Sequence, residues 1–112
     1  MAIAVNATKE TLATTYTGLA SHASLHTADP GTTGTSEVTG GTYARVAITW
    51  VPGGSDGIST ASVSFNVPAT TATTHVALWS AITGGTFRDK AVCVIPSGTA
   101  RVVPVNLTFT QT

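Results

Sequence analysis

The sequence is poor in charged side chains. Asp, Glu, Lys and Arg make up 9% of its 112 residues, against about 25% in an average protein. The five basic and five acidic residues cancel, so the formal net charge is zero. Without a basic excess there is little counterion release to drive nucleic-acid binding and little attraction to anionic lipid. We therefore expect neither a nucleic-acid partner nor a membrane partner.

Cysteine and long apolar runs are also scarce. Cys93 is the only cysteine, which excludes an intramolecular disulfide. Its apolar neighbours in residues 91–95 predict a buried, unreactive thiol. No apolar stretch approaches the roughly 20 residues of a membrane span, and residues 1–5 lack the regions of a signal peptide. These absences predict synthesis in the cytosol.

Threonine is what the sequence has in excess, at about a fifth of the chain. Its β-branched side chain favours strands, and its hydroxyl keeps an exposed face polar without charge. The length suits a single domain. We expect one domain over residues 1–112, with an N-terminal arm and helix in residues 1–22 and a β-sandwich body in residues 23–112.

Residues 9–20 carry the one helical pattern. Leu12, Tyr16 and Leu19 are spaced by four and three residues, which places them on one narrow helical face. Asn6 or Thr8 is expected to cap this helix, with Glu10 in its first turn and an end near Gly18. A short, threonine-rich helix is marginal alone, so this face must dock on its own sheet or on a neighbouring subunit.

The remainder predicts strands separated by glycine- and proline-containing turns. Period-2 alternation marks residues 44–50, 61–67 and 103–109, with Pro104 typical of an edge strand. Residues 75–82 are apolar on both faces, as in a central strand, and residues 23–28 and 91–95 give two more short strands. Asp29-Pro30-Gly31 predicts a tight turn. The fold class is therefore mainly β, an antiparallel, jelly-roll-like sandwich with a short N-terminal helix.

Residues that could carry chemistry do not form a recognisable motif. His22, His26 and Asp29 invite a metal-site interpretation, but His26 is expected to lie in a strand and no further ligand stands nearby. No serine or cysteine occurs in a nucleophile motif, and the carboxylates are scattered. We expect no catalytic residue, no metal and no cofactor, so the chain is not predicted to be an enzyme.

Two other groups of residues are candidate structural or binding sites. Glu37 and Arg45 flank Gly40-Gly41, so they can pair as a clamp that fixes the loop or as a solvated surface pair. Trp79 and Phe87, with Tyr43 and Trp50, are large aromatic anchors for the core or for a subunit interface. An exposed aromatic near Gly84-Gly85 would instead indicate a platform for sugar stacking.

Six segments carry a combined pattern: residues 24–34, 37–41, 43–45, 65–68, 78–80 and 84–87. Together they resemble a family of small structural proteins found in phages of actinobacteria, of the tail-fibre, minor capsid or head-decoration type. The resemblance implies a virion component with a β-sandwich body, and it implies no catalytic residue. The segment after Lys90 departs from the family pattern.

Composition and resemblance together predict a structural protein of the virion. The small, neutral chain without fibrous repeats favours a head-decoration protein that binds the major capsid protein or other virion proteins, as a homotrimer. The alternative is a tail-fibre or tail-tip module that binds host surface glycans. Leu12, Tyr16, Leu19, Trp79 and Phe87 are the expected partner-interface residues.

Overall fold

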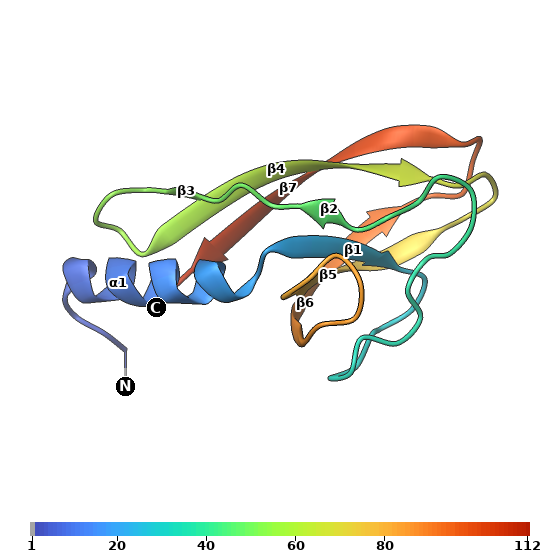
Figure 1. Cartoon of the computed structure of the whole chain (residues 1–112). Helices are drawn as coiled ribbons and strands as arrows, with labels where there is room; N and C mark the ends of the chain where they lie inside the picture. Colours follow the sequence, from blue (N-terminus) through green and yellow to red (C-terminus); the bar gives the residue numbers. More distant parts are fainter. Residues whose placement is uncertain (1) are drawn as a thin grey trace.

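The computed structural model describes residues 2–112, which form one α-helix and seven strands in two antiparallel sheets (Figure 1). One sheet has the strand order β2-β1-β5-β6 and the other β3-β4-β7. The prediction of a mainly β sandwich with a short N-terminal helix is confirmed. The bounds are α1 Asn6–Leu19, β1 His22–His26, β2 Val46–Ala47, β3 Val51–Pro52, β4 Ile58–Val67, β5 Thr73–Trp79, β6 Phe87–Ile95 and β7 Arg101–Thr110.

The long β4-β7 ribbon forms because both strands alternate apolar and polar residues over most of their length. They pair antiparallel from Ile58 opposite Thr110 to Val67 opposite Arg101. The apolar residues of β4 point inward, and Phe65 is completely buried at the centre of the core. Pro104 lies in β7, an edge strand of its sheet, where a residue without an N–H is tolerated.

The four-stranded sheet supplies the opposite wall of the core. β5 lies between β1 and β6, as its two apolar faces predicted, and Val76 and Leu78 point into the core. Leu25 of β1 is completely buried beside them.

Residues 44–50 do not form the single strand that their alternation predicts. Val46 pairs with Ala23 of β1, whereas Val51 pairs with Thr60 of β4. The segment crosses from one sheet to the other, so it cannot maintain one ladder. Its alternation is still meaningful, because Val46 and other apolar side chains of this crossing pack against the core.

The helix begins earlier than predicted and is capped differently. Asn6 is its first residue and Val5 its N-cap, with no side-chain cap bond, so capping by Asn6 or Thr8 is wrong and Glu10 lies beyond the first turn. Gly18 does not end the helix, which continues to Leu19. Helix formers such as Ala7 allow the earlier start.

The helix extends the layer of the four-stranded sheet. Figure 1 shows α1 and β1 running end to end, with β4 and β7 passing over both. Where the β4-β7 ribbon extends beyond the four-stranded sheet, the helix therefore takes the place of a second sheet. The molecule is about twice as long as it is wide, 46 × 24 × 22 Å. In the described part of the chain, no helix has the length and apolarity to cross a membrane.

Strand β6 is longer and more exposed than predicted. Its apolar end was expected to be buried, but Val92 and Val94 are 75% and 72% exposed. Cys93 is half-buried, so the prediction of a buried thiol is wrong, although burial still raises the pKa of its side chain. The reason is topological: β6 is an edge strand whose outward side chains meet no other layer.

Candidate functional site

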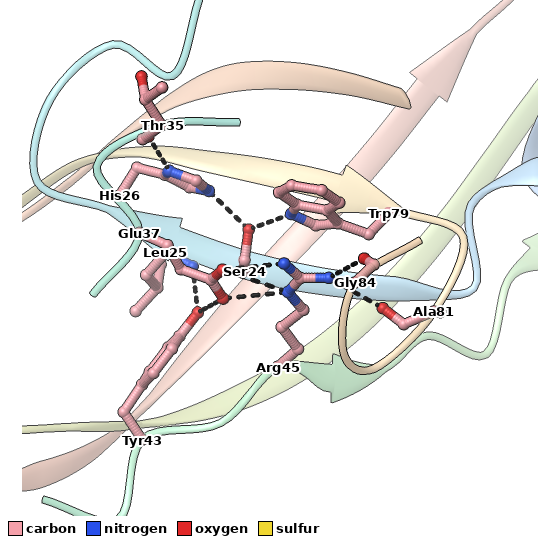
Figure 2. Close-up of polar contacts among 10 residues, drawn as sticks. All are labelled: Ser24, Leu25, His26, Thr35, Glu37, Tyr43, Arg45, Trp79, Ala81 and Gly84. Carbon is pink, nitrogen blue, oxygen red and sulfur yellow. Dashed lines mark hydrogen bonds and ion pairs between the residues drawn. The ribbon is translucent and has the colours of Figure 1, made fainter. Parts of the chain in front are cut away.

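The outer face of β1 carries buried polar side chains that are linked to one another by hydrogen bonds (Figure 2). The indole Nε1–H of Trp79 donates to Ser24 Oγ at 2.8 Å, and Ser24 Oγ lies 2.7 Å from His26 Nε2. His26 Nδ1 lies 2.6 Å from the carbonyl oxygen of Thr35. Ser24 and His26 share a face because they are two residues apart on a strand.

These contacts determine the protonation of His26. A carbonyl oxygen only accepts, so Nδ1 carries the proton and donates to Thr35, and Nε2 accepts from the Ser24 hydroxyl. Burial lowers the pKa of His26 below its ordinary value, outweighing the opposing effects of the Thr35 bond and Glu37. The imidazole is thereby held neutral.

A serine hydroxyl bonded to a histidine is also the first part of a nucleophilic dyad. Here both side chains are completely buried, and the Ser24 oxygen already accepts the Trp79 N–H. A substrate cannot reach that oxygen. We therefore assign the pair a structural role.

Arg45 is the centre of a second set of contacts, adjacent to the first (Figure 2). Its Nε and Nη2 donate to the carboxylate of Glu37, with a 3.0 Å ion pair, and its side chain is only 9% exposed. Its Nη1 donates to the carbonyl oxygens of Ala81 and Gly84. The guanidinium also stacks 3.7 Å from the centre of the Trp79 ring. One side chain therefore links residues 37–45 to the loop after β5.

Tyr43 connects this arrangement to the strand. Its hydroxyl donates to Glu37 Oε2 at 2.9 Å and accepts the backbone N–H of Leu25 at 2.9 Å. Burial raises the pKa of the phenol above its ordinary value. The predicted pair of Glu37 and Arg45 is thus in contact, and its role as a clamp of the loop stays a prediction.

The loop after β1 covers this polar layer. The predicted Asp29-Pro30-Gly31 turn is present, with the Gly31 N–H bonded to Asp29 Oδ1 at 2.8 Å. Lys90 of β6 pairs with the same carboxylate at 2.5 Å and holds the pKa of Asp29 below its usual range. Gly34 has a φ of +81°, and a Cβ there would overlap the Trp79 ring. Only glycine lets the loop lie this close to the indole.

The predicted interface residues of the helix divide into two groups. Tyr16 stacks on Phe109 of β7 with ring centroids 3.7 Å apart, and its hydroxyl bonds to Asp89 of β6. Leu12 and Leu19 stay 41% and 46% exposed. The helix thus docks on its own sheet through Tyr16 and leaves two leucines for another contact.

The aromatic candidates are more buried than a binding platform requires. Trp79 is 7% exposed, and its edge-to-face partner Phe87 is partly buried, with ring centroids 5.5 Å apart. Trp79 therefore offers no exposed stacking face, because the Gly34 loop and Arg45 cover its ring. The sequence did not predict the hydrogen bond from Trp79 to Ser24, because only the fold brings these two residues together.

Residues 2–112 hold no group of three or more His, Cys, Asp or Glu side chains that could bind a metal. His22 bonds to Ser21, and Asp29 is engaged by Lys90, so the His22–His26–Asp29 set does not assemble.

One family model matches residues 5–93, and it describes the podophage GP4 fiber I protein gp80. The match covers well over half of the chain and runs from the start of α1 into β6. The chain belongs to this fibre protein family. No curated protein and no solved structure matches the chain.

Membership of the gp80 fibre family makes this a phage structural protein, as the sequence predicted. The family points to a fibre rather than to the head-decoration function that small size favoured. The narrower resemblance to proteins from phages of actinobacteria stays a prediction. The family match ends at Cys93, so β7 lies outside it. This end is close to Lys90, after which the sequence departs from the pattern of the phage family that it resembles. Most segments that carry the resemblance contribute to the Ser24 and Arg45 contacts.

Proposed function

We propose that the chain is a structural subunit of a phage tail fibre that holds its place through contacts with other virion proteins. The family match over residues 5–93 is the observation that carries this proposal. The fold supports it, because hydrogen bonds fix the loop after β1 and the loop after β5 around Trp79, and Ser24 and His26 are closed to substrate. A rigid body with few charges suits dense packing beside neighbours.

Position and copy number in the virion test the proposal. Quantitative mass spectrometry of purified particles gives the ratio of this chain to the major capsid protein, and gold-labelled antibody gives its location. A fibre subunit predicts a small ratio and label on the tail. A ratio near that of the major capsid protein, with label over the head, would instead establish the head-decoration function.

The exposed side of α1 is our candidate surface for contact with another virion protein. Leu12 and Leu19 are two turns apart, and a helical wheel places both within about 60° of Tyr16. Because Tyr16 reaches Asp89 and the Leu19 carbonyl accepts a bond from Arg88, both leucines border the β6 side of the molecule.

Point substitutions test this surface better than deletion of residues 1–20, which would remove Tyr16 and uncover Phe109. Leu12→Glu should lower incorporation into particles, and Thr14→Glu, on the opposite side of the same helix, should not. Equal incorporation of both variants would remove the helix from the interface. The predicted homotrimer stays a prediction that sedimentation of the purified chain measures directly.

A further inference from the structure

The sandwich is open along one side. On the other side, residues 44–52 cross between the sheets and close it, whereas β6 and β7 are joined only by the turn at residues 96–100. Between these two edge strands lies a groove of about 380 Å³. The sheets face each other here across small β6 side chains, Ala91 and Cys93, which leave the space unfilled.

The groove is mainly apolar. Its lining includes Val76, Leu78, Val105 and Leu107, which also belong to the hydrophobic core of the molecule. Two charged residues line it and both already have partners: the Asp89 carboxylate accepts the Tyr16 hydroxyl, and the Lys90 ammonium pairs with Asp29. An occupant must therefore be an uncharged, apolar segment.

The chain itself exposes such a segment. Residues 2–5 read Ala-Ile-Ala-Val and precede the helix in a non-helical conformation, with Val5 58% exposed and Ile3 partly exposed. Ile3 and Val5 are two residues apart, so an extended arm presents both on one face with the small alanines on the other. Figure 1 shows this arm leaving the body at the free end of α1.

The arm is poorly placed to reach its own groove. Tyr16 lines the groove, and the helix sets Val5 about 16 Å from Tyr16 at 1.5 Å per residue. Four extended residues span at most about 14 Å and would have to double back along the helix. A neighbouring molecule meets no such restriction.

We propose that residues 2–5 of one copy of this chain occupy the groove between β6 and β7 of the next copy. Ile3 and Val5 enter the groove, where they cover the core residues Leu78 and Leu107. The arm lies between the sheets rather than extending β6, because register shifts interrupt the β6 ladder near both of its ends. A contact between two different surfaces closes into a ring or continues as a filament.

Cys93 provides a test because it lines the groove. In Ile3→Cys, mild oxidation with diamide, which accepts the two electrons and two protons of the thiols, should join the thiol introduced in the arm of one copy to Cys93 of the next. Every chain then has two linkable sites, so a non-reducing gel should show dimers, trimers or a longer ladder. The double variant Ile3→Cys, Cys93→Ser has no thiol in the groove, so its chains should run as monomers on the same gel.

Complementation gives a second, independent readout. Ile3→Asp places a charge in the apolar arm and leaves the groove intact. Ala91→Trp fills the groove and leaves the arm intact. Each variant alone should sediment as a monomer, and an equal mixture should form a heterodimer. Ala100→Trp, at an exposed alanine outside the groove, is the matched control and should associate like the parent chain.

Three results would overturn the proposal: a disulfide within one chain of Ile3→Cys, a parent chain that stays monomeric, or association that survives Ala91→Trp. The proposal stands apart from the fibre assignment, because these experiments use the purified chain. If the arm does not bind the groove of the next copy, the proposed position of the protein in the virion is unaffected. If antibody label lies over the head, the proposed contact between arm and groove is unaffected.

Discussion

Replacing Arg45 with methionine should lower the free energy of unfolding by about 3 kcal/mol. Methionine keeps the aliphatic contact with Trp79 and removes the charge and every hydrogen bond. Loss of one partner from a buried ion pair costs about 3–5 kcal/mol. The lower end applies here, because the Glu37 side chain is 23% exposed and water can reach it. The carbonyls of Ala81 and Gly84 add little, since they lie in an exposed loop.

Urea unfolding followed by tryptophan fluorescence measures this loss, with a double-mutant cycle to isolate the pair. Glu37→Gln combined with Arg45→Met should show a coupling of about 1–2 kcal/mol. Arg45→Lys restores the charge without the paired donors, so it should recover less than half of the stability. A loss below about 1 kcal/mol for Arg45→Met, the range of solvated surface pairs, would refute the clamp.

Three further predictions concern the same face and the core. Burial lowers the pKa of His26 in the folded state. The contribution of the neutral His26 side chain to stability is therefore complete above the unfolded pKa of about 6.5 and is lost as the pH falls below that value. Urea midpoints should drop more steeply with acid in the parent chain than in His26→Gln. Gly34→Ala should destabilise the protein by about 1–3 kcal/mol more than Gly31→Ala, because both glycines have a positive φ but only Gly34 faces the Trp79 ring. Thermal unfolding of the two variants measures this difference. Thr73→Val should raise the free energy of unfolding by about 1 kcal/mol, because the buried Thr73 hydroxyl has no hydrogen-bond partner, and an unchanged or lower urea midpoint would contradict this.

The parts of the fold that could be predicted are those whose signal lies within one element. The alternation in β4 and β7 fixes their inward faces, and Asp29-Pro30-Gly31 specifies its own turn. Glu37 and Arg45 lie eight residues apart across a glycine turn, so their contact also follows from local sequence.

The parts that could not be predicted depend on distant segments. An apolar run such as residues 91–95 predicts burial, and only the strand order shows that β6 is an edge whose outer face is bare. The bond from Trp79 to Ser24 joins residues 55 positions apart, and the burial of Trp79 depends on Gly34 in a loop. No periodicity encodes either contact.

The pairing of β4 with β7 has a consequence for the order in which the molecule folds. β4 ends at Val67, and its long partner begins at Arg101, whereas its other neighbour, β3, has two residues. β7 is synthesised after β4, β5 and β6, so one edge of β4 stays unpaired until β7 has been made. Pairings so distant in sequence form slowly. The three-stranded sheet must therefore assemble late, after β5 and β6 have been made, and every new copy passes through a state with an exposed apolar strand.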